Sequence, residues 1–206
     1  MTATPSSAQD DLAFLRALVQ PGNILQRGLG ESYLAAGLCY GVQMLLSAAQ
    51  VAGLIPATQA VSLTVAIGPT AVFIVLLIAI VGRTWAEPPT GSVGKAIGAV
   101  FGCIGAANLA LIAVIGLVAL RQHSLTTWLI YPCAAFVLQG AAWLVSYSLR
   151  RRPWHGVIGL GWFATAVVMA WFVQSTTGFI LVTGAGLILF MLTPGWVMMR
   201  HAARHA

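Results

Sequence analysis

The stretch SYSLRRRPWHGV, residues 146–157, places three consecutive arginines between two apolar segments. Charged residues make up only 7% of the 206-residue chain, whereas 59% of its residues are hydrophobic. A soluble domain carries about 25% charged residues, so this composition predicts a protein whose solvent is lipid. In such a protein, a basic run between two apolar segments is typical of a loop on the cytoplasmic side.

Six apolar stretches are each long enough for a membrane-spanning helix, which needs about 20 residues. None of them contains Asp, Glu, Lys, Arg or His, and short connections with turn residues separate most of them. They cover residues 32–55, 60–82, 96–120, 125–149, 156–173 and 178–199. The sequence therefore predicts an all-α integral membrane protein with six transmembrane helices arranged as three helical hairpins.

The basic residues are distributed unevenly between the two sides of the predicted bundle. Of the ten Lys and Arg residues, only Arg121 lies in the first, third or fifth loop. This asymmetry predicts that both termini are cytoplasmic, as in a multi-pass protein of the bacterial inner membrane. We expect four arginines to fix this topology and to meet anionic lipid headgroups, namely Arg83, Arg150, Arg151 and Arg152. A site for a specific acidic ligand at the arginine run is the alternative.

The predicted bundle covers residues 31–200, between a cytoplasmic N-terminal segment of residues 1–30 and a short cytoplasmic tail of residues 201–206. Ser7 and Asp10 form a helix-capping pattern, and leucines recur at helical spacing after them. A short amphipathic helix is therefore expected over about residues 8–20. It either lies on the membrane surface or docks a partner.

Small residues at four-residue spacing predict where helices approach closely in lipid. Two glycine series show this spacing, and their members are Gly37, Gly41, Gly94, Gly98 and Gly102. Their packing partners could belong to the same chain or to another copy in a homo-oligomer.

Polar side chains within the spans predict the interior of the bundle, because amides are costly to expose to hydrocarbon. In the first span they form one stripe, at spacings of seven, three, four and three residues, which consists of Tyr33, Tyr40, Gln43, Ser47 and Gln50. The candidates for the interior are Tyr40, Gln43, Ser47, Gln50, Asn108, Gln139 and Trp143. Two interpretations remain open for them. Either they form hydrogen bonds between helices, or they line a polar cavity or pathway.

The residues that most enzymes need are missing from the spans. No predicted span contains a carboxylate, a histidine or a basic group, and the four histidines lie at span edges or in the tail. The three cysteines lie within spans and are odd in number, which argues against a disulfide framework. We therefore expect no catalytic residue, no metal site and no cofactor. The basic residues lie at span edges, so nucleic-acid binding is not expected either.

Two functional hypotheses follow from these patterns. The first is a non-enzymatic interaction or sensor protein embedded in the membrane, which binds membrane lipids and a protein partner at its cytoplasmic face or a small apolar ligand. The second is a small permease, or the membrane subunit of a transporter, for an uncharged solute. A tightly packed bundle with an exposed cytoplasmic groove would favour the first hypothesis, and an open, water-filled interior would favour the second.

Overall fold

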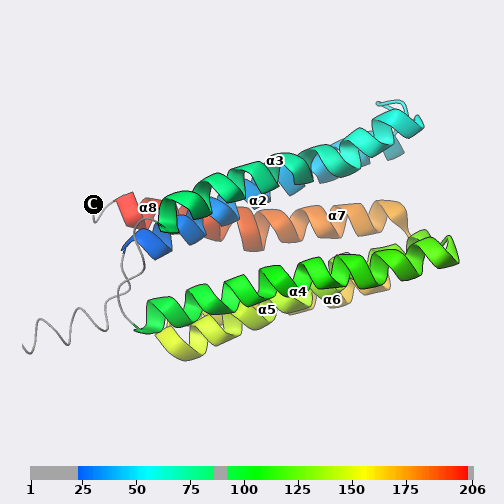
Figure 1. Ribbon diagram of the computed structural model, residues 1–206. Helices are drawn as coiled ribbons and strands as arrows, with labels where there is room; N and C mark the ends of the chain where they lie inside the picture. Colours follow the sequence, from blue (N-terminus) through cyan, green and yellow to red (C-terminus); the bar gives the residue numbers. More distant parts are fainter. Residues whose placement is uncertain (1–22, 86–91, 204–206) are drawn as a thin grey trace, which may run out of the picture.

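A computed structural model describes residues 23–85 and 92–203, and every regular element in these two ranges is helical (Figure 1). The elements are α2 (Asn23–Val51), α3 (Gln59–Trp85), α4 (Ser92–Gln122), α5 (Leu125–Arg150), α6 (Pro153–Trp171), α7 (Thr176–Leu187), the π-helical segment η1 (Ile188–Leu192) and α8 (Thr193–Ala203). The predicted amphipathic helix over residues 8–20 lies outside the described residues.

Six helical segments are long and apolar enough to cross a membrane. They are Arg27–Val51, Gln59–Arg83, Ser92–Gln122, Leu125–Arg150, Pro153–Trp171 and Thr176–Arg200. The sixth is made of α7, η1 and α8 in continuous succession. The six predicted apolar helices are therefore confirmed, and they indicate a multi-pass helical membrane protein.

The first helix differs from its predicted span at both ends. It begins at Asn23 rather than at residue 32, and its early turns carry an ion pair between Arg27 Nε and Glu31 Oε1 at 3.0 Å. A pair of opposite charges four residues apart supports a helix that hydropathy alone would not extend. The helix ends at Val51 because Gly53, with φ of 73°, turns the chain.

The order of the helices in space differs from their order in the chain. Helix α3 packs against α2, and α2 packs against the α7–η1–α8 segment. That segment packs against α6, which is followed by α5 and then α4. Figure 1 shows α2 and α3 on one side of α7, with α4, α5 and α6 on the other. Helices α3 and α4 are thus the two edges, and their exposed leucines, isoleucines and valines suit contact with lipid.

The sixth segment is irregular where it meets α2. Pro194 has no backbone N–H, and the N–H of Thr193 donates to the carbonyl of Ile188, five residues earlier. The Thr193 hydroxyl donates to the same carbonyl at 2.8 Å. Just beyond this π turn, a Cβ atom on Gly195 would lie 2.6 Å from the backbone nitrogen of Leu34. Glycine is therefore required where α8 crosses α2.

The core lies between α2, α5, α6 and the α7–η1–α8 segment, and aromatic side chains dominate it. Trp162 is completely buried, and its ring meets Phe136 edge-to-face with centroids 4.5 Å apart. Trp143 is 2% exposed and contacts the rings of Tyr33 and Phe101. The middle of the bundle is thus filled by rings rather than open to solvent.

Candidate functional site

The polar residues of α2 contact two neighbouring helices, α3 and α5. Gln43 Nε2 donates to the carbonyl of Ala66 in α3 at 3.2 Å, and the ring of Tyr40 lies 5.4 Å from that of Phe73 in α3. Gln50 Nε2 donates to the hydroxyl of Ser62 at 3.3 Å. These three candidates connect α2 to α3.

The other candidates of the predicted cavity are distributed over α2, α4 and α5. Ser47 is half-buried on α2. Asn108 Nδ2 donates to the carbonyl of Ile104 in its own helix at 3.1 Å, and its buried Oδ1 has no hydrogen-bond partner among the described residues. Only Gln139 and Trp143, both in α5, share a cluster.

That cluster is completed by Tyr33 of α2. The indole Nε1 of Trp143 donates to the Tyr33 hydroxyl at 2.8 Å, and this hydroxyl donates to Oε1 of Gln139 at 2.6 Å. The Trp143 indole N–H, the Tyr33 hydroxyl and Oε1 of Gln139 are all engaged in this chain of two hydrogen bonds, which ties α2 to α5. A satisfied network of this kind fixes the position of its members in a low-dielectric core.

The glycines of the two predicted series lie in different environments, some packed against a neighbouring helix and some not. Gly37 is buried against the sixth segment, Gly94 is buried and Gly98 is half-buried. At Gly41 and Gly102 an added Cβ would meet no atom within 4 Å. These two glycines therefore face no neighbouring helix within the described part of this chain.

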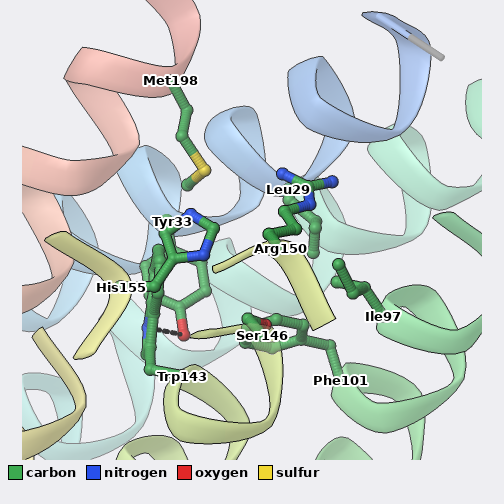
Figure 2. A pocket seen from close by; sticks show the side chains of 9 residues that line it. All are labelled: Leu29, Tyr33, Ile97, Phe101, Trp143, Ser146, Arg150, His155 and Met198. Atoms are coloured by element: carbon green, nitrogen blue, oxygen red, sulfur yellow. Dashed lines mark hydrogen bonds between the residues drawn. The ribbon is translucent and has the colours of Figure 1, made fainter. Parts of the chain in front are cut away.

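A small cavity lies beside the Tyr33–Trp143 hydrogen bond, at the end of the bundle where the arginine run joins α5 to α6 (Figure 2). Its volume of about 10 Å³ is the size of one water molecule. Six of the residues that line it carry rings or polar groups, namely Tyr33, Phe101, Trp143, Ser146, Arg150 and His155.

Three of the lining residues carry buried polar atoms without a hydrogen-bond partner in the described parts of the chain. These atoms are the Ser146 hydroxyl oxygen, His155 Nδ1, and Nε and Nη2 of Arg150. Ser146 is 3% exposed and His155 is 2% exposed. Unpaired polar groups buried in this way are costly, and four atoms around one cavity call for a common explanation.

The local sequence explains why these groups meet. Gln139, Trp143, Ser146 and Arg150 follow one another at spacings of four, three and four, so they share one face of α5. Arg151 then adopts the left-handed conformation with φ of 53°, and its N–H donates to the carbonyl of Tyr147. The chain reverses within two residues, and α6 begins at Pro153.

This tight reversal returns His155 to the end of α5. The imidazole interacts with the backbone of Ser146 and lies edge-on to two indoles, with centroids 4.1 Å from Trp154 and 5.3 Å from Trp143. The contact of His155 with α5 could not be read from spacing within one helix. The sequence did contain one signal for this site. Arg150 lies four residues after Ser146 and therefore shares its face of α5.

The positive charge of Arg150 has no carboxylate beside it in residues 23–85 and 92–203. Glu31 is the carboxylate of these ranges, and it pairs with Arg27 at 3.0 Å and with Arg83 at 3.4 Å. Within the same ranges, no three His, Cys, Asp or Glu side chains gather as metal ligands, and the three cysteines are free. The cluster combines a hydroxyl, an imidazole and a guanidinium, which is a donor set suited to an anion.

Comparison of the chain with protein-family models, curated proteins and solved structures gives no match. The functional argument therefore rests on the residues described above.

Proposed function

We propose that this chain is a non-enzymatic interaction or sensor protein of the bacterial inner membrane, which holds a partner protein at its basic end. The observation that carries the proposal is the contrast between its middle and that end. Aromatic side chains fill the middle, where Asn108 Oδ1 and Trp162 Nε1 are the buried polar atoms without a partner among the described residues, whereas four such atoms and the exposed Arg151 and Arg152 gather where α5 joins α6.

A permease for an uncharged solute is the weaker proposal. It needs a polar path between the helices, but Gln43 and Gln50 are hydrogen-bonded to α3 and its loop, and Gln139 is hydrogen-bonded to Tyr33. The cavity lined by Tyr33 and Trp143 has room for one water molecule. These features are better explained by a bundle that stays closed while its surface binds.

The proposed topology has three helical hairpins with both termini and the arginine run in the cytoplasm. Its support is the distribution of basic residues together with the contacts of α2 with α3, α4 with α5, and α6 with α7. To test it, the native cysteines are replaced by alanine and a single cysteine is placed at Arg151 or His123. A membrane-impermeant maleimide should label position 123, and not position 151, in sealed cells. The reverse pattern would overturn the orientation.

Native mass spectrometry of the full chain, released gently from its own membrane, tests the interaction itself. We expect a second polypeptide at fixed stoichiometry. Replacing Arg151 and Arg152 by Gln should reduce its retention, because both side chains are exposed at the proposed docking end. Arg121→Gln is the matched control, since Arg121 is an exposed arginine in the last turn of α4, away from the junction of α5 and α6. A lone chain, or equal losses from both variants, would contradict the proposal.

A further inference from the structure

We infer that the cavity beside Arg150 binds one end of a phosphate-type oxyanion, held by Arg150, Ser146 and His155. The inference names a ligand for the proposed sensor and rests on that proposal only for its biological role. The same chemistry is offered by the phosphate of a lipid headgroup and by free phosphate, and the experiment below separates the two sources.

The first argument is the geometry of the unpartnered guanidinium atoms. Nε and Nη2 of Arg150 are both buried without a hydrogen-bond partner among the described residues, and their N–H bonds point from the same edge of the guanidinium plane. This edge is the fork that binds two oxygens of a carboxylate or phosphate in parallel. A buried cationic fork is costly without an anion, and Glu31 is already paired with Arg27 and Arg83.

The second argument is the behaviour of Ser146. A serine inside a helix usually donates its hydroxyl to the carbonyl four residues earlier, and Ser148 does so to Leu144 at 3.1 Å. Ser146 departs from this pattern, because its buried hydroxyl has no partner in the described parts of the chain. Its hydroxyl is therefore free to donate into the cavity that it lines.

His155 supplies a further nitrogen from α6. Its Nδ1 is buried and unpartnered, while its ring is held between Trp143 and Trp154. Figure 2 shows Ser146 and Arg150 of α5 together with His155 of α6 around the cavity. An imidazole nitrogen donates only when it carries a proton, so His155 completes the donor set in the state with a proton on Nδ1, which a neighbouring anion favours.

The start of α6 adds a favourable field at the same place. Arg152 caps the helix without a side-chain hydrogen bond, and Pro153 follows as the first helical residue. The N-terminus of a helix carries partial positive charge and attracts anions. Here it only reinforces the donors of Arg150, Ser146 and His155.

The size of the cavity decides which part of the anion it takes. About 10 Å³ accommodates one oxygen-sized group and not a whole phosphate. The rest of the phosphate must lie outside the cavity, on the side where Arg150 is only half-buried and Arg151 and Arg152 are exposed. A tethered headgroup at the membrane boundary and a free ion could both approach from there.

The test uses the full chain in phosphatidylcholine nanodiscs. In one arm, native mass spectrometry measures binding of added phosphatidic acid. In the other, inorganic phosphate is added and the thermal unfolding temperature is followed. We expect one phosphatidic acid per chain, with Arg150→Gln weakening binding by about tenfold or more and Arg150→Lys by less, because Lys keeps the charge but loses the fork. Arg121→Gln, at an exposed arginine in the last turn of α4 and away from this cavity, is the matched control and should weaken binding by less than about threefold.

The two arms identify the source of the anion. Binding of phosphatidic acid without a response to inorganic phosphate indicates a lipid headgroup. A rise in unfolding temperature with inorganic phosphate alone, lost in Arg150→Gln, indicates a free ion. Without any anion, Arg150→Gln should unfold at the same or a higher temperature than wild type, because it removes an unpaired buried charge. A purely structural role of Arg150 predicts a lower temperature.

Several results would overturn the inference. The first is the absence of binding in both arms, and the second is equal weakening by Arg150→Gln and Arg121→Gln, which would indicate general charge. A third is binding that is absent in wild type and appears only in an Asp10→Asn, Asp11→Asn, Glu87→Gln variant, which would show that a carboxylate of the chain fills the site. A retained partner polypeptide with no binding of either anion contradicts this inference alone, and a bound anion without a partner contradicts the proposed function alone.

Discussion

Gly37 of α2 lies directly against the backbone of Leu192 in η1, where an added Cβ would be 2.9 Å from both the Cα and the backbone nitrogen of Leu192. No flexible side chain is available to move aside. The Gly37→Ala variant should therefore lose about 1–3 kcal/mol of stability, since overpacking forces backbone shifts. Gly41, four residues later on the same helix, meets no atom within 4 Å, and Gly41→Ala is the matched control.

Thermal unfolding of both variants in the same detergent measures this difference. Gly41→Ala should remain within about 0.5 kcal/mol of wild type, as expected away from packed features. Equal losses from both variants would mean that Gly41 also packs tightly. If Gly41→Ala keeps its stability but changes the oligomeric state, a second copy contacts this face.

The Tyr33 hydroxyl is a second point where a small change should have a large effect. Tyr33→Phe leaves the indole N–H of Trp143 without an acceptor and Oε1 of Gln139 without its donor. We expect a loss of about 1–3 kcal/mol, because unsatisfied polar groups would remain in the core. Tyr147→Phe, at an exposed tyrosine of α5, should change stability by less than about 0.5 kcal/mol. A double-mutant cycle with Gln139→Leu would show additive losses if the hydrogen bond contributes nothing.

Gln43 forms another hydrogen bond between helices, and its removal should have a smaller effect on stability. Its amide donates to the Ala66 carbonyl at 3.2 Å, and Gln43→Leu removes this bond without stranding a second side chain. Interhelical hydrogen bonds in membranes average about 0.6 kcal/mol, so we expect a loss of that size and much less than for Tyr33→Phe. Chemical denaturation in mixed micelles can rank the two variants. A larger loss for Gln43→Leu would show that the α2–α3 contact, rather than the Tyr33 network, dominates the stability of the bundle.

The turn between α5 and α6 predicts a substitution that should stabilise the protein. Arg151 adopts φ of 53°, a conformation that costs a side-chain-bearing residue about 1–2 kcal/mol and that glycine adopts freely. Arg151→Gly should therefore raise stability by up to about 1 kcal/mol, after part of the gain is offset by the freer unfolded chain. Arg152 has φ of −91°, so Arg152→Gly should give no gain. An unfolding temperature that falls for Arg151→Gly would show that its side chain is needed for the reversal.

The number of helices could be predicted from hydropathy because lipid requires long apolar segments with satisfied backbones. The faces of α2 were harder to predict, because seven-residue spacing falls short of two full turns and a polar stripe drifts around a straight helix. Between Tyr33 and Gln50 the direction changes by about 100°. The start of the stripe therefore meets Gln139 in α5, while its end meets Ser62 in α3.

The residues that share the polar face of α5 could be predicted from their spacing, but the site that they form with α6 could not. Gln139, Trp143 and Ser146 share that face, and Arg150 continues it within about 60° of arc. Charge counting places Arg150 among the arginines of the loop, which fits its sequence position but not its half-buried environment. The difference arises from His155, whose return onto Ser146 depends on the left-handed Arg151 turn. No periodicity within a single helix carries that information.

The contact between α2 and α8 sets an order for biosynthesis. A chain enters the membrane from its N-terminus, so α4, α5 and α6 can pack together as soon as they emerge. Helix α2 is made first, yet its extensive partner, the α7–η1–α8 segment, is made last. The newborn protein must therefore leave Gly37 without its partner Leu192 until translation is nearly complete, whereas Tyr33 can already meet Gln139 and Trp143 of α5.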